Sequence, residues 1–173
     1  MQEHHLSVNR TARYFTLGSS SRGVAEVWFA CHGYGQLAAR FLEKLRVLDD
    51  GRRYLVAPEG LSRFYLSESP AERRVGASWM TREDRLAEID DYVPYLDAVS
   101  ADVFRSLDRA RVTVHALGYS QGAATASRWV AMGKAKIVQT TTARLRQHGI
   151  PYREVPFEGG HELNEAVLRS LGE

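Results

Sequence analysis

The sequence is poor in several features that mark particular classes of protein. Cysteine occurs once in 173 residues, as Cys31 inside an apolar run, so the chain has no disulfide framework and fits a reducing compartment. No stretch approaches the ~18 consecutive apolar residues of a membrane span. The polar start, Met1 to Leu6, lacks the long apolar stretch of a signal peptide. From these absences we expect a cytoplasmic protein that does not span a membrane.

Charge of one sign is not in excess either. Lysine and arginine number 23 against 21 aspartates and glutamates, and the basic residues are spread along the chain rather than clustered as in a nucleic-acid footprint. The six histidines include no pair at helical metal-ligand spacing with an acid between them. We therefore expect no nucleic-acid partner and no metal site. The length predicts one domain, 1–173, with a single sizeable core.

Apolar runs that read as strands alternate with helical periodicity along most of the chain. The predicted strands are 5–8, 14–17, 24–31, 54–57 and 112–117, and the predicted helices are 37–48, 86–107 with a kink at Pro94, and one after the serine motif ending at Gly133. A weak helix near 140–147, a strand near 152–157 and a closing helix from Leu163 follow. Residues 59–80 show little periodicity and are predicted to be an irregular excursion. This alternation predicts an α/β fold, with a mostly parallel sheet covered by helices on both faces.

The most informative motif is Gly-Tyr-Ser-Gln-Gly at 118–122. It directly follows the apolar run 112–117 and leads into the small-residue segment 123–127. A serine on a sharp strand-to-helix turn has a strained backbone, so its neighbours on both sides must be small. The turn exposes the hydroxyl, and the following helix points its first amides at negative charge that develops there. The pattern predicts Ser120 as a nucleophile; the alternative is a turn whose glycines only permit tight packing.

A serine hydroxyl needs a base to take its proton, and His161 is the best candidate. It follows Gly159-Gly160 beyond the last predicted strand, at the start of the closing helix. The alternative for His161 is a helix-capping histidine. His4, His5, His115 and His148 stand at less suitable places: the terminus, a strand and a helix end.

Acyl transfer also needs two donors for the tetrahedral oxyanion. The backbone N–H of Gln121, next to the nucleophile, is expected to supply one of them. The second is expected from Tyr34 N–H, in the glycine-rich segment 32–36 that follows an earlier strand. A plain strand-to-helix turn and a phosphate cradle are the alternatives, but a phosphate cradle would want a longer loop with Lys and Ser or Thr.

Five co-linear motifs together resemble the phospholipase/carboxylesterase family of α/β-hydrolases, which includes bacterial carboxylesterases and acyl-protein thioesterases. They are Cys31-His-Gly-Tyr-Gly-Gln36, Ala57-Pro-Glu-Gly60, Gly76-Ala-Ser-Trp-Met80, Gly118-Tyr-Ser-Gln-Gly122 and Gly159-Gly-His-Glu162. The resemblance implies an α/β-hydrolase-type fold and ester or thioester hydrolysis without a cofactor. It marks Ser120 as nucleophile and His161 as base, and it suggests that Trp79 lines the acyl pocket. Core packing is the alternative role for Trp79.

One expected element is absent from the sequence. A catalytic triad needs a carboxylate to orient the histidine. The resemblance implies that this acid belongs to an Asp-Pro element at a strand end between the nucleophile and the histidine. Between Ser120 and His161 there is no aspartate, and the only glutamates are Glu154 and Glu158. The segment 134–139 has room for only one short strand, ending near Gln139 and Thr140. The fold is thus expected to be truncated between the nucleophile helix and the last strand, either because the sequence lacks a segment or because the deletion is genuine.

These observations lead to one main functional expectation and two alternatives. The main expectation is a serine carboxylesterase that hydrolyses short to medium acyl esters through an acyl-enzyme on Ser120, with His161 as general base. An acyl-thioesterase or a lysophospholipase would use the same residues. An alternative of another class is a catalytically impaired α/β-hydrolase-like binding protein that lacks the triad acid.

Overall fold

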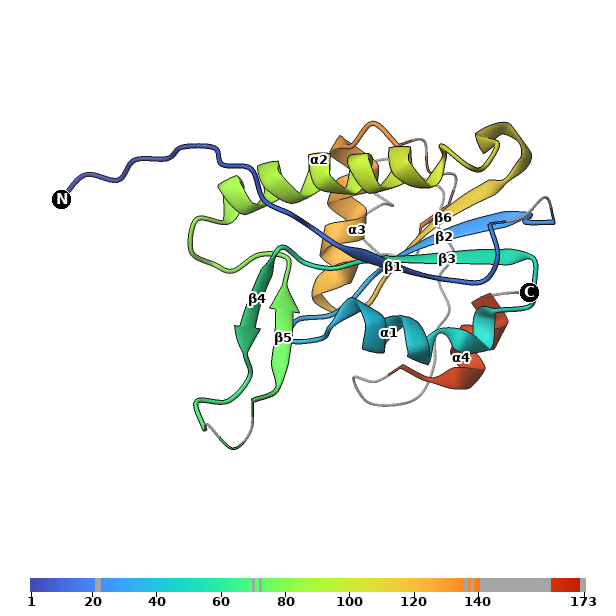
Figure 1. Cartoon of the computed structure of the whole chain (residues 1–173), viewed down its shortest axis with the longest axis horizontal. Coiled ribbons are helices and arrows are strands. Elements are labelled where there is room, and N and C mark those ends of the chain that lie inside the picture. Colours follow the sequence, from blue (N-terminus) through green and yellow to red (C-terminus); the bar gives the residue numbers. More distant parts are fainter. Residues whose placement is uncertain are drawn as a thin grey trace.

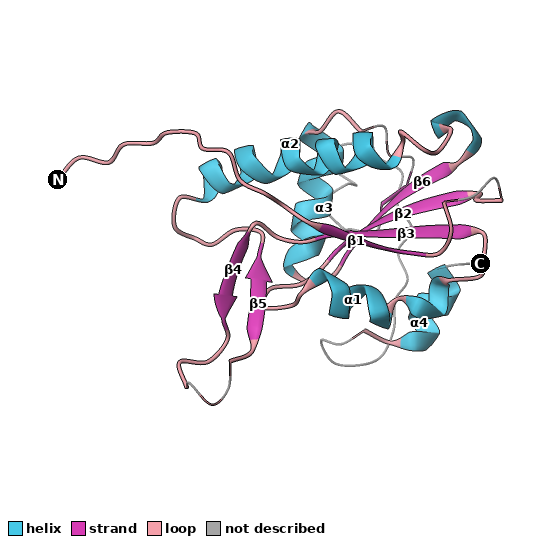
Figure 2. Cartoon of the chain, in the orientation of Figure 1, coloured by secondary structure: helices cyan, strands magenta, loops and turns pink. Residues whose placement is uncertain are grey.

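The computed structural model describes residues 1–20, 23–69, 71, 73–135, 137, 139–140 and 163–171. Its centre is a five-stranded sheet in the order β1-β3-β2-β6-β7. The strands are β1 (Tyr14–Leu17), β2 (Glu26–Cys31), β3 (Arg53–Pro58), β6 (Thr113–Gly118) and β7 (Gln139–Thr140). Only β1 runs antiparallel to its neighbour, β3, whereas the β2–β3, β2–β6 and β6–β7 pairs are parallel. The expected mostly parallel sheet is therefore confirmed (Figure 2).

Helices cover both faces of this sheet, as the alternating pattern predicts (Figure 1). They are α1 (Ala38–Lys44), α2 (Arg85–Val103), α3 (Gln121–Met132) and α4 (Glu165–Leu171), with short 3₁₀ turns η1 (Arg46–Leu48) and η2 (Arg109–Arg111). Alternate residues of the central strand β2 serve the two layers: Val27, Phe29 and Cys31 pack in the cluster with α2 and α3. Trp28 and Ala30 pack in the cluster with α1 and α4. No helix in the described ranges is long and apolar enough to cross a membrane.

Two local predictions are wrong. Residues 5–8 form no strand; they belong to an exposed segment at the N-terminus that extends away from the body (Figure 1), so their alternation has no neighbouring strand to satisfy. The supposedly irregular stretch 59–80 contains an antiparallel hairpin, β4 (Ser62–Tyr65) and β5 (Val75–Ser78), which projects from the body near the start of α2. Pro94 lies inside α2, and Gly133 is the C-cap residue of α3, as expected. The strand predicted at 152–157, and all but Thr140 of the helix predicted at 140–147, lie outside the described residues.

Candidate active site

Ser120 occupies a strained turn between β6 and α3. Its backbone angles are φ 55° and ψ −118°, and it is the N-cap residue of α3. Only one other non-glycine residue in the described part of the chain, Asp84, has a positive φ. A non-glycine residue held in so sparsely populated a backbone conformation costs about 1–3 kcal/mol, and such strain is concentrated at functional sites. The side chain of Ser120 is exposed at the carboxyl end of the parallel strands.

The glycines around Ser120 are required by close packing. A Cβ at Gly122 would overlap the Cys31 carbonyl oxygen, and a Cβ at Gly118 would overlap the backbone of Ala123. The first turn of α3 therefore lies directly against the end of β2. This contact brings Ser120 to the loop that follows β2, and a Cβ at Gly33 would lie 3.3 Å from the Ser120 Cβ.

We expect Gly122→Ala to destabilise the fold strongly. The added methyl group meets backbone atoms that cannot rotate away, so α3 must shift from the sheet, at a cost of about 2–3 kcal/mol or more. Thermal unfolding should show a decrease in Tm of several degrees. Gly23→Ala is the matched control, because a Cβ at Gly23 has no neighbour within 4 Å. A Gly122→Ala variant as stable as the control would contradict the described packing of α3 on β2.

The loop after β2 is held in place by the hairpin. Gly35 N–H donates to Ala77 O at 2.9 Å, and Ala77 N–H donates to Gln36 O at 3.1 Å. The Gln36 side chain accepts from Gly33 N–H at 2.9 Å. Within the described ranges the N–H groups of Tyr34 and Gln121 donate to no acceptor. The two N–H groups expected to bind an oxyanion thus belong to the loop after β2 and to the first residue of α3, which meet beside Ser120.

The buried side chains of His32 and Trp79 hold this loop in position. The His32 side chain is buried; its Nε2 accepts from Gly60 N–H at 2.9 Å, so Nδ1 carries the proton and donates to Gly33 O at 2.8 Å. The Trp79 indole N–H donates to the His32 carbonyl at 2.8 Å, and the two rings pack with centroids 5.0 Å apart. Trp79 is 2% exposed and belongs to the core cluster on the α2 and α3 side. The structure therefore places Trp79 in the core beneath the loop, which is the alternative role that the sequence left open.

Glu59 and Gly60 tie the end of β3 to the same loop. Glu59 is 2% exposed; its carboxylate accepts from Arg13 at 2.7 Å, from Arg63 at 3.2 Å and from Ala38 N–H at 3.3 Å. Burial by itself would raise the pKa of Glu59, but these hydrogen bonds more than offset it and hold the pKa below its ordinary value. Glu59 is thus a charged anchor that links β3 to the start of α1.

We expect the stability of the protein to fall as the pH drops below about 6.5, partly through His32. Burial, only partly offset by the contact with Gly33 and the charge of Glu59, lowers the pKa of His32. Between the lowered pKa of the folded state and the ordinary pKa of the unfolded state, the unfolded chain binds a proton that the folded chain does not. The contribution of neutral His32 to stability is therefore fully present above the ordinary pKa and is lost as the pH falls below it. Urea unfolding from pH 8 to pH 5.5 should show a steeper loss for the wild type than for His32→Gln. An equal loss of stability with pH in the two proteins would mean that His32 does not contribute to the pH dependence.

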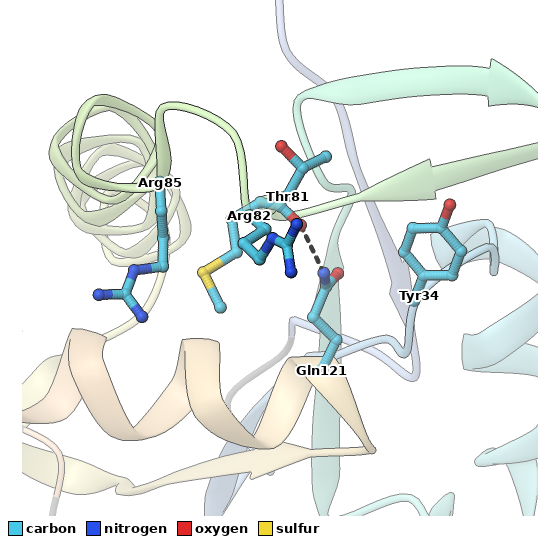
Figure 3. A pocket seen from close by; sticks show the side chains of 6 residues that line it. Tyr34, Thr81, Arg82, Arg85 and Gln121 are labelled. Carbon is cyan, nitrogen blue, oxygen red and sulfur yellow. Dashed lines mark hydrogen bonds between the residues drawn. The ribbon is translucent and has the colours of Figure 1, made fainter.

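The Gln121 side chain has a role that the sequence did not reveal. Its Oε1 accepts from Trp79 N–H at 3.0 Å, and its Nε2 donates to Met80 O at 2.6 Å (dashed line in Figure 3). These bonds join the first residue of α3 to the segment after β5. Because the partners are more than 40 positions apart, no local pattern predicts the contact. Gln121 therefore fixes one wall of the site.

Beside the Ser120 turn lies an open depression of about 480 Å³. It is lined by Tyr34, Met80, Thr81, Arg82, Arg85 and Gln121. Figure 3 shows Tyr34 on one side of Gln121 and the two arginines on the side that faces the start of α2. The structure thus brings together two of the residues expected in the site, Tyr34 and Gln121, at the edge of a space open to solvent.

The expected base, His161, lies outside the described residues, and so do Glu154 and Glu158. The predicted short strand before them is present as β7, which pairs with His115 and Ala116 of β6. Asp97 is not suited to be the triad acid. Its carboxylate accepts from the Trp129 side chain and from Lys134 N–H, both at the far end of α3. A 12-residue helix separates that end from Ser120, which corresponds to about 18 Å.

Solved structures similar to this chain include several esterases and a thioesterase. The fold resembles esterase PE8, with TM-score 0.67 and 18% identity over 94% of this chain and 97% of that chain. It also resembles a carboxylesterase from Mesorhizobium loti, with TM-score 0.66 and 17% identity over 92% and 93% of the two chains. Acyl-protein thioesterase 2 from Zea mays gives TM-score 0.53 and 15% identity over 76% of this chain and 61% of that chain. The protein therefore has the α/β-hydrolase fold that its motifs indicate.

At the level of sequence, no family model matches the chain, and no curated protein matches it. The similarity to solved structures is therefore a similarity of fold.

Proposed function

We propose that the protein is a serine carboxylesterase of the phospholipase/carboxylesterase family. The observation that carries this proposal is the backbone of Ser120, strained at φ 55° and exposed at the turn from β6 into α3. A structural serine gains nothing from such a conformation, whereas a nucleophile gains access to substrate and to the first amides of a helix. The similarity of the fold to esterases and to a thioesterase supports the same reaction class.

In the proposed mechanism the Ser120 hydroxyl attacks the ester carbonyl while His161 accepts its proton. The carbonyl oxygen becomes an oxyanion that accepts hydrogen bonds from Gln121 N–H and Tyr34 N–H. The alcohol then leaves with the proton from His161, and water hydrolyses the acyl-enzyme by the reverse sequence of proton transfers. His32 acts as a positioning residue, because its two ring nitrogens hold the loop that carries Tyr34.

The first test is turnover of p-nitrophenyl butyrate by the wild-type protein. We expect hydrolysis without added metal, unchanged by EDTA, and covalent labelling of Ser120 by a fluorophosphonate probe, located by peptide mass spectrometry. Both responses need an activated serine. Activity that disappears on chelation and returns with zinc would contradict the serine mechanism. A protein that binds esters but is neither labelled nor active would be the impaired binding protein instead.

A further inference from the structure

The charged side chains that line the depression beside Ser120 are all cationic. Arg82 and Arg85 are among the residues that line it, and no acidic residue of the described part of the chain does so. Neither arginine forms an ion pair within the described part of the chain. Other exposed arginines do so: Arg46 pairs with Glu43, Arg105 with Asp102 and Arg111 with Asp108. Four other exposed arginines, Arg10, Arg40, Arg52 and Arg74, also lack an ion pair in the described part of the chain, so the local feature is that Arg82 and Arg85 both line one depression.

Two of the three carboxylates close to these arginines in the sequence have other partners: Glu88 accepts hydrogen bonds from the Thr81 N–H and hydroxyl, and Asp84 accepts one from His5 at 2.9 Å. The third, Glu83, is exposed and forms no ion pair with Arg82 or Arg85 in the described part of the chain. These contacts hold the segment that carries Arg82 and Arg85, both of which line the depression. In Figure 3 Arg82 lies beside the Gln121 side chain, and Arg85 extends from the start of α2 on the side away from Tyr34.

A third guanidinium lies beside this lining. Arg128 of α3 is half-buried, with its Nη1 3.6 Å from the Met80 sulfur and 3.4 Å from the Tyr92 hydroxyl. Neither of these two partners carries a negative charge. Met80 also lines the depression, so the positive charge of Arg128 adds to that of Arg82 and Arg85 on the same side of the site.

We propose that the site accepts esters that carry an anionic group, a carboxylate or a phosphate, which Arg82 and Arg85 bind. This deepens the proposed function and depends on it for the reaction itself. Guanidinium groups form paired, charge-assisted hydrogen bonds with both kinds of anion. The anion would neutralise the two arginines while the ester carbonyl lies between Gln121 N–H and Tyr34 N–H. A purely apolar acyl ester leaves both cations without a partner.

The test compares phenyl butyrate with two anionic relatives, monophenyl glutarate and 4-carboxyphenyl butyrate. They carry the carboxylate on the acyl half and on the alcohol half, respectively. We expect Arg82→Gln/Arg85→Gln to lower kcat/KM for at least one anionic ester, relative to phenyl butyrate, by about tenfold compared with the wild type. High salt should reduce the wild-type preference in the same direction, because these cations are exposed. Arg105→Gln/Arg111→Gln is the matched control, with two exposed arginines removed far from the depression.

A binding measurement separates this inference from the proposed function. Glutarate and glycerol 3-phosphate, but not neutral glutaramide, should raise the Tm of the wild type and of the control variant. The same anions should have little effect on the Tm of Arg82→Gln/Arg85→Gln. The two ligands also show whether a carboxylate or a phosphate is preferred.

Each outcome decides one of the two claims. If no ester is hydrolysed and the probe labels no serine, the proposed function fails, while an arginine-dependent shift in Tm still supports the anion site. If the esters are hydrolysed but the double variant keeps the wild-type preference and Tm shifts, the anion site is wrong and the esterase stands.

Discussion

Ser120→Ala should reduce ester turnover by on the order of 10⁴-fold or more and abolish labelling by the fluorophosphonate probe. The substitution removes the atom that forms the acyl-enzyme, and the oxyanion donors alone retain only a small part of the catalysis. The backbone at position 120 has to keep the strained φ of 55° in the variant, so the substitution tests the hydroxyl and leaves the turn unchanged. Initial rates with p-nitrophenyl butyrate, together with a Tm measurement, give both readouts.

A matched control is available on the same helix. Ser127 lies within α3, where its hydroxyl donates to Ala123 O at 2.7 Å. Ser127→Ala should keep wild-type turnover and lose about 1 kcal/mol of stability, because it removes the hydrogen bond to Ala123 O within the helix. If Ser120→Ala and Ser127→Ala have the same rates, the nucleophile lies elsewhere.

The strands β2, β3 and β6 could be predicted from the sequence because they are buried on both faces and read as continuous apolar runs. The hairpin could not, since its strands are only four residues long and their sequences, Ser-Arg-Phe-Tyr and Val-Gly-Ala-Ser, do not alternate polar and apolar residues. Its position depends on the pairing of Ala77 with Gln36, a contact between distant segments. The segment 5–8 shows the reverse case, where alternation is present but no strand lies beside it.

In the candidate site, too, features set by consecutive residues could be predicted, whereas contacts between distant segments could not. The Ser120 turn was predictable because strand, glycines and helix are consecutive, and the local pattern therefore determines the geometry. The hydrogen bonds of His32 with Gly60 and of Gln121 with Trp79 join residues far apart in the sequence. Arg82 and Arg85, which line the depression together with Gln121, are likewise far from it along the chain. One feature of the sequence did indicate that these arginines lie near the site, since Arg82 and Arg85 closely follow the Gly76–Met80 motif.

The second large effect concerns the triad acid. If the chain of 19.5 kDa contains no further segment between β7 and His161, the imidazole has no aspartate partner. Replacing the acid by its amide in a serine protease costs on the order of 10⁴-fold in kcat, and we expect a deficit of that order relative to an esterase with a complete triad. Labelling of Ser120 should then be slow but detectable, because nucleophile, base and oxyanion donors persist. Intact-mass measurement has to accompany the kinetics, so that the length of the assayed chain is known.

Between Ser120 and His161, Glu158 is the carboxylate nearest to the histidine in the sequence, and its substitution tests whether it serves the histidine. Glu158→Gln should leave turnover unchanged if no carboxylate has that role, whereas a loss on the order of 10³-fold or more would identify Glu158 as the acid. Turnover typical of an intact esterase in the unmodified chain, unaffected by Glu158→Gln, would require a carboxylate from elsewhere. Asp97 is excluded from that role, because its hydrogen bonds hold it at the far end of α3.

Adding a carboxylate at the sheet edge is the complementary experiment. Gln139→Asp or Thr140→Asp places an acid on the short strand β7, next to β6, which leads to Ser120. An imidazole without a charged partner gains both orientation and stabilisation of its protonated form from such a group, so the rate should rise if the two can meet. Recovery of rate in either variant would show that an acid at this sheet edge can reach His161. Rates that stay at the unmodified level in both variants would mean that β7 ends too far from the histidine to replace the missing acid.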